Sequence, residues 1–229
     1  MAIARVQTAV VAASATATSV GVALGSNVAS GNVIVASAKH RTTATGFTDT
    51  LSHSYSKDVD YIGNDADNEV VIGMANLTSS GACTITFTQS GSSRIGISLN
   101  EYTFSGGATF DKSSTATANN SSLDSGATAT TTAADELLVG IGSTSNSANF
   151  TWTNSFTMVG ESTTSRHGSG DRIVTATGAY NATATLSGST LWAAAIATYK
   201  EAGGAGRTTK NTRGFPLGVN VGMGWRMAV

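Results

Sequence analysis

Apolar and polar residues alternate with a period of two along most of the chain, which is the pattern of half-buried β-strands. Gly, Asn, Asp and Ser mark the turns between these segments, and β-branched residues fill the alternating positions. We predict strands over VQTAVV, SVGVAL, NVIVASA, EVVIGMA, CTITFTQ, RIGISLNEY, ELLVGIGS, ANFTWT, SFTMVGE, RIVTATG, NATATLS and TLWAAAIATY. About a dozen short strands without a helical stripe are typical of a sandwich or barrel. The pattern therefore predicts an all-β protein in which residues 1–201 form a single antiparallel β-sandwich domain.

Two segments interrupt this alternation and are expected to be exposed loops. Residues 111–132 consist almost entirely of Ser, Thr, Ala and Asn, and residues 162–172 combine glycines with mixed charges. Such compositions bury little apolar area, so the first of them is predicted to be a loop or a weakly held edge hairpin. The strands RIGISLNEY and TLWAAAIATYKE both end in a Tyr near an acid, but the match is too short to establish a repeat.

The C-terminal 28 residues differ from the rest of the chain. Residues 202–214 hold four glycines, three basic residues and no acid, a composition typical of a flexible linker. From residue 215 onward the odd positions are apolar, whereas the even positions are mostly small or polar. This is the clearest strand signal in the chain, and it predicts a C-terminal β-strand arm over residues 215–229. Its apolar face consists of Phe215, Leu217, Val219, Val221, Met223, Trp225 and Met227, and continues to Val229.

An isolated strand of this kind needs a cover for its apolar face. Either it folds back as the last strand of its own sandwich, or it adds to a sheet edge of another chain, where backbone hydrogen bonds supply the affinity. A lead of 13 residues spans at most about 40–45 Å and is much longer than an ordinary hairpin loop, which favours the second interpretation. The basic residues Arg207, Lys210 and Arg213 are candidates for contacts with an acidic partner surface.

The composition and the net charge argue against nucleic-acid and membrane partners. Only 12% of the residues are charged and the net charge is −1, so no global field favours nucleic acid. No apolar run approaches the roughly 20 residues needed to span a bilayer, so no membrane partner is expected. Cys83 is the single cysteine, which rules out an intrachain disulfide, and its place in ACTITFTQ predicts a small buried hydrophobe.

The densest charge cluster lies in KDVDYIGNDADNE. Its carboxylates belong to Asp58, Asp60, Asp65, Asp67 and Glu69. Calcium takes 6–8 oxygen ligands, so alternating acids in a loop make a structural calcium site a candidate, although the spacing does not fit an EF-hand. The alternatives are a solvated acidic loop and a pair of glycosidase carboxylates. No other cofactor is indicated.

The histidines and aromatic residues give weaker signals. His40, His53 and His167 lack metal-ligand spacing, so they are expected to be surface or loop residues, and a zinc site would require tertiary convergence. There is no G-x-S-x-G nucleophile motif. Several aromatic residues, including Trp152, Trp192 and Trp225, suggest a sugar-binding platform as the alternative to core packing.

The segment TTTAADELLVGIGSTSNSANFTWTNSFTMVGE, with the later RIVTATGAYNATATLSGSTLWAAAIATYKEA, resembles β-rich accessory structural proteins of tailed phages. The resemblance covers residues 130–201 and implies a jelly-roll-like sandwich that serves as a decoration, tail or fibre component of the virion without catalytic residues. It implies self-association or binding to other virion proteins. We therefore expect a non-enzymatic virion structural protein; the alternatives are a carbohydrate-binding sandwich module of a phage or bacterial surface protein and a glycan-degrading enzyme.

Overall fold

The computed structural model describes residues 3–7, 10–64 and 67–203. Within these residues the chain contains thirteen β-strands and no helix, arranged in two antiparallel sheets. The first sheet contains β1 (Ala4–Arg5), β2 (Val10–Ala23), β3 (Val33–His40), β4 (Ala44–Asp49), β5 (Val59–Ile62), β6 (Glu69–Asn76) and β7 (Thr84–Thr103). The second sheet contains β8 (Ala108–Asp124), β9 (Asp135–Thr144), β10 (Phe150–Trp152), β11 (Thr157–Ser162), β12 (His167–Thr175) and β13 (Thr183–Glu201).

The two sheets have the same strand order. In the first, β7 pairs with β2, β3 and β4, and the order continues from β3 through β6 to β5. In the second, β13 pairs with β8, β9 and β10, and the order continues from β9 through β12 to β11. Each strand from β2 to β7 therefore has a counterpart six strands later. The chain contains two consecutive units with identical pairing order.

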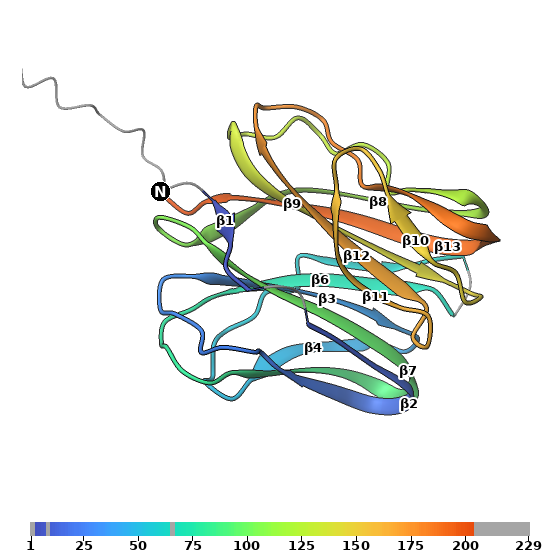
Figure 1. Ribbon diagram of the computed structural model, residues 1–229, viewed down its shortest axis with the longest axis horizontal. Coiled ribbons are helices and arrows are strands. Elements are labelled where there is room, and N and C mark those ends of the chain that lie inside the picture. The colour runs from blue at the N-terminus through green and yellow to red at the C-terminus, as the bar shows by residue number, and fades with distance from the viewer. Residues whose placement is uncertain (1–2, 8–9, 65–66, 204–229) are drawn as a thin grey trace, which may run out of the picture.

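A bend in the long strands gives each unit its own core. β2 and β7 shift register twice between Ser14 and Ser19, and β8 and β13 shift register between Thr185 and Thr190. Bulges of this kind increase bending and twist. Beyond the bend, β7 pairs with β4 and β13 pairs with β10, and these parts cover the outer faces of β3 and β9. Figure 1 shows the resulting layers, with β4 and β7 at one side of the molecule and β8 and β10 at the other.

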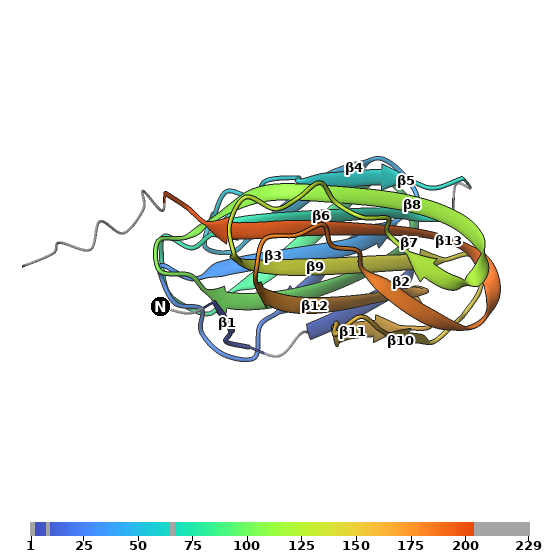
Figure 2. The ribbon, with the colours of Figure 1, turned by 90° about the horizontal axis from the view of Figure 1, so that it is seen from above.

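The inner faces of the two sheets meet in a central core. Side chains alternate between the two faces of a strand, so β3 directs Val33 and Val35 into this core and Ile34 into the core of its own unit. The second unit contributes Leu137 and Val139 of β9 in the same way. The strands of the two sheets run in nearly the same direction (Figure 2), as in an aligned sandwich.

Two buried tyrosines join the units reciprocally. The Tyr102 hydroxyl of the first unit donates to Asp171 Oδ2 of the second at 2.9 Å, and the Tyr199 hydroxyl of the second donates to Asp58 Oδ2 of the first at 2.9 Å. Both tyrosines are fully buried. Burial raises the pKa of both carboxyl groups, and the tyrosine hydrogen bonds oppose that rise. Each unit thus supplies a donor for a carboxyl group of the other.

The all-β class and the antiparallel sandwich that the alternation predicts are confirmed. The jelly-roll connectivity is not, because each sheet consists of consecutive strands rather than strands that alternate between sheets. Residues 111–132 were predicted as a loop or a weakly held edge hairpin; residues up to Asp124 belong to the edge strand β8, so the loop is wrong for them and the edge position agrees with the second alternative. Likewise, the predicted loop 162–172 forms the end of β11, a short turn and the first part of β12.

Candidate functional site

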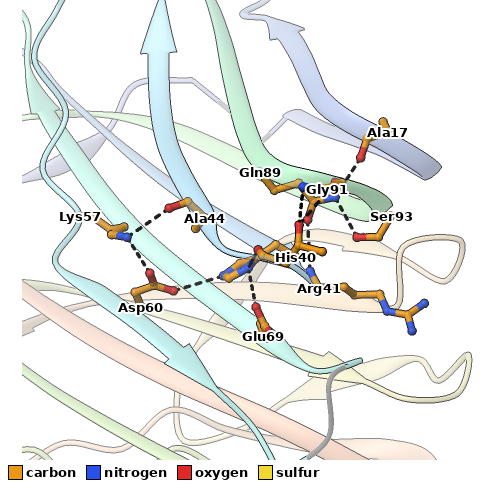
Figure 3. A network of polar contacts seen from close by, with 11 residues as sticks. Ala17, His40, Arg41, Ala44, Lys57, Asp60, Glu69, Gln89, Gly91 and Ser93 are labelled. Atoms are coloured by element: carbon orange, nitrogen blue, oxygen red, sulfur yellow. Dashed lines mark hydrogen bonds and ion pairs between the residues drawn. The ribbon is translucent and has the colours of Figure 1, made fainter.

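The acidic segment lies against the end of β3, where His40 is almost fully buried (Figure 3). His40 Nδ1 is 2.9 Å from the carbonyl oxygen of Thr42 and 3.0 Å from Glu69 Oε2. On the other side of the ring, Nε2 is 3.3 Å from Asp60 Oδ1, outside hydrogen-bond geometry. The His40 ring and then the Lys57 ammonium, 2.7 Å from Asp60 Oδ2, lower the pKa of the Asp60 carboxyl. These side-chain contacts connect the end of β3 to β5 and β6.

The same network extends to the bend of β7. The buried Gln89 side chain accepts a hydrogen bond from the Arg41 backbone at 3.2 Å. Its amide nitrogen donates to the carbonyl oxygen of Ala17 at 2.9 Å and to Ser93 Oγ at 2.8 Å. Gln89 therefore satisfies a backbone N–H after β3 and a backbone carbonyl of β2, next to the register shift between β2 and β7. Figure 3 shows these contacts beside His40. Together they connect the bend of β7 to β2 and to the residue that follows β3.

The other acids of this segment have different partners. Asp58 accepts the hydrogen bond from Tyr199, and Asp67 forms an ion pair with Arg41. Asp65 lies outside the described residues. The four described carboxylates are thus divided among Tyr199, His40 and Arg41 instead of facing one another. The calcium site stays a prediction.

All three histidines are buried, so the expectation of surface histidines is wrong; His53 lies in a loop, as expected, whereas His40 and His167 belong to strands. His167 of β12 lies between the sheets, where Nε2 is 3.0 Å from Ser98 Oγ and Nδ1 is 2.6 Å from Ser165 Oγ. Burial, and then the nearby Lys39 ammonium, lower the pKa of His167 to about 3. A neutral ring serves as one donor and one acceptor, which the two hydroxyls satisfy.

The third histidine belongs to a cluster that has no recognisable motif in the sequence. His53 Nδ1 is 2.8 Å from Asp49 Oδ2, and His53 Nε2 is 3.1 Å from Ser79 Oγ. Cys83 offers its sulfur within 4.8 Å of the Asp49 and His53 donor atoms. The chain of contacts from Ser79 through His53 to Asp49 matches that of a hydrolytic triad. That chemistry also needs an oxyanion site and a substrate cavity. The three cavities described below are lined by other segments.

The two described tryptophans pack inside the second unit. Trp192 is 3% exposed, and its Nε1 donates to Asn120 Oδ1 at 3.1 Å. Trp152 stacks on Phe156 with ring centroids 5.8 Å apart and lies against the inner strands. These contacts correspond to the core-packing interpretation of the aromatic residues. Trp225 lies outside the described residues.

Three shallow cavities lie at the ends of the sheets. A cavity of about 540 Å³ is lined by Asp135, Lys200 and Glu201 among others, and the Glu201 carboxylate is already bound by the Ser105 backbone N–H at 2.8 Å. A second, of about 440 Å³, lies beside the Asp171 carboxylate, which the Arg5 guanidinium contacts at 3.0 Å through both oxygens. A third, of about 350 Å³, is lined by residues 30–32 and 104–107. Glu201 in the first cavity and Asp171 in the second therefore already hold structural hydrogen bonds or ion pairs.

The predicted arm and the basic residues Arg207, Lys210 and Arg213 lie outside the described residues, so both stay predictions. No helix among the described residues is long and apolar enough to cross a membrane. Comparison of the chain with protein-family models, with curated proteins and with solved structures gave no match.

Proposed function

We propose that this chain is a non-enzymatic virion structural protein, as a capsid decoration, tail or fibre component, that assembles through β-sheet contacts and its C-terminal arm. The observation that carries the proposal is the alternation of residues 215–229. Eight successive odd positions are apolar, and such a face gains stability only when another surface covers it. The strand follows a Gly-rich linker of 13 residues. This linker is long enough for the strand to pair with a sheet of a second copy or with a sheet of its own chain.

The edge strand β8 supports the proposal because it offers a template for strand addition. It runs for 17 residues and pairs on one side with β13, its only partner among the described strands. Its outward residues are mainly Ser, Thr, Ala and Asn, and it lacks the proline that blocks edges in other proteins. A long edge without proline presents unpaired backbone groups to an incoming strand. β13, the neighbour of β8, ends at Glu201, directly before the linker.

The buried polar groups support a structural role over a catalytic one. Tyr102, Tyr199 and His167 all have hydrogen-bond partners that connect the two units or lie at their interface. Such reciprocal bonds fix the relative position of the sheets, which a building block of a larger assembly requires.

A charge placed on the apolar face of the arm is expected to abolish assembly. Val221→Asp would bury a carboxylate at a cost of about 3 kcal/mol or more, which weakens association on the order of 100-fold. Asn220→Asp adds the same charge to the opposite face and is the matched control. Mass photometry should find oligomers for the wild type and for Asn220→Asp, and monomers for Val221→Asp. A monomeric wild type, or assembly that is equal in both variants, would contradict the proposal.

A further inference from the structure

The cluster around His53 brings three metal-ligand types together from separate parts of the first unit. Asp49 ends β4, His53 follows in the next turn, and Cys83 directly precedes β7. One donor atom from each residue lies within 4.8 Å of the other two. The side chains of Asp49 and His53 are fully buried, and Cys83 is 2% exposed. Pairing of β4 with β7 creates this convergence.

Hydrogen bonds already hold the Asp49 carboxylate in a fixed orientation. Its Oδ1 accepts the backbone N–H groups of Leu51 at 2.8 Å and of His53 at 3.2 Å. Its Oδ2, the oxygen that faces His53 Nδ1, also accepts the Tyr55 hydroxyl at 3.0 Å. The turn between the ligands contains Ser52 at φ 63°, a left-handed conformation that costs free energy in a non-glycine residue. The local backbone is thus shaped around the carboxylate.

The imidazole directs one nitrogen into the cluster and the other towards Ser79. Its Nδ1 faces Asp49 and lies in the cluster, whereas Nε2 is 3.1 Å from Ser79 Oγ and accepts the Ser79 backbone N–H at 3.4 Å. A histidine that coordinates through one nitrogen carries its proton on the other and donates it to a nearby oxygen. When zinc binds through Nδ1, the ring proton is carried on Nε2, where the Ser79 hydroxyl can accept it and fix the ring orientation.

We propose that Asp49, His53 and Cys83 bind one zinc ion in the interior of the first unit. Sulfur, imidazole and carboxylate ligands are those that zinc prefers, and three of them leave one position of a tetrahedron for a water molecule or the Tyr55 hydroxyl. A thiolate and a carboxylate together carry two negative charges, which a divalent cation neutralises. The buried site is then free of net charge.

Zinc binding at this site has a chemical consequence that can be measured. Zinc coordination requires the thiolate, so binding releases a proton. The zinc site would link the end of β4 to the start of β7 and thereby stabilise the outer part of the first unit.

The test is metal binding by the full chain. Elemental analysis of protein purified with zinc in the medium should find about one zinc per chain, as the three-residue site requires. Titration of the chelator-treated protein with Co²⁺ should produce a thiolate-to-cobalt charge-transfer band and the visible bands of four-coordinate cobalt. Zinc added to the same protein should raise its melting temperature and release about one proton per ion in weakly buffered solution.

Two substitutions locate the site. Cys83→Ser should abolish the charge-transfer band, and His53→Gln should reduce zinc content by at least tenfold. His40→Gln changes a buried histidine that lies between two other carboxylates and should leave zinc content unchanged. The wild-type measurements are decisive even where a variant fails to fold. Absence of zinc and of cobalt bands in the folded wild type, or the loss of metal only with His40→Gln, would overturn the proposal.

Discussion

Replacing Gly96 by alanine is expected to destabilise the protein by about 3 kcal/mol, because overpacking a fixed core forces neighbouring groups to move. Gly96 lies in β7, and an added Cβ would overlap the His167 ring and the Ser165 hydroxyl. The ring has no free direction of movement, since Ser98 and Ser165 hold its two nitrogens. In a chain of this size the loss corresponds to a melting temperature lower by roughly 10 °C.

Gly188→Ala provides the matched control, because a Cβ at Gly188 has no atom within 4 Å and the residue is exposed. Its expected effect is within about 0.5 kcal/mol. Urea unfolding of the three proteins compares their free energies of unfolding. Equal stability of Gly96→Ala and Gly188→Ala would show that the two units are not packed as described around His167.

Acidification from pH 7 to pH 5 is expected to cost about 2 kcal/mol through His167 alone. The folded pKa of about 3 lies below the unfolded value of 6.5. Between these values the unfolded chain binds a proton that the folded chain does not, so stability falls as the pH decreases through 6.5 and continues to fall towards 3. Above the unfolded pKa this contribution to stability is fully present. The physical cause is first the burial of the ring, which disfavours its charged form, and then the nearby Lys39 ammonium.

His167→Asn isolates this contribution, because asparagine also offers one donor and one acceptor group but does not titrate. Urea unfolding between pH 7 and pH 5 should give a steeper loss of stability in the wild type than in His167→Asn. The other histidines and all carboxyl groups are the same in both proteins, so the difference between the two curves belongs to His167. Parallel curves would contradict a neutral, buried His167.

The strands of the inner layers could be predicted because both of their faces are covered. NVIVASA, EVVIGMA and ELLVGIGS correspond to β3, β6 and β9 within one or two residues. Every residue of β3 is buried, and β6 and β9 are buried along most of their length. Apolar and small residues therefore dominate these segments, and the signal is strong.

The ends of the long strands could not be predicted from the sequence. The polar residues between CTITFTQ and RIGISLNEY suggested a turn, but they belong to the bend of the continuous strand β7. Similarly, NATATLS and TLWAAAIATY are parts of β13. β8 was predicted only as an alternative to a loop, because its stability depends on backbone pairing with β13, for which apolar side chains are not required.

The similar strand pairing of the two units could not be predicted from the sequence. Tyr102 and Tyr199 occupy corresponding places near the ends of β7 and β13, and their sequence context was the one similarity visible between the halves. What repeats is the order of strand pairing, which many sequences satisfy. The convergence of Asp49, His53 and Cys83 was likewise invisible, since it depends on the pairing of β4 with β7 and not on spacing along the chain.

Hydrogen–deuterium exchange of the full chain tests the proposed assembly through the arm most directly, because the arm's backbone amides exchange slowly only when they are hydrogen-bonded in a sheet. We predict slow exchange in peptides covering residues 215–229 of the wild-type oligomer, together with slower exchange at a sheet edge. Exchange of the same peptides should be fast in monomeric Val221→Asp. Fast exchange of the arm within an oligomer, or slow exchange in a wild-type chain that is monomeric, would contradict assembly through the arm.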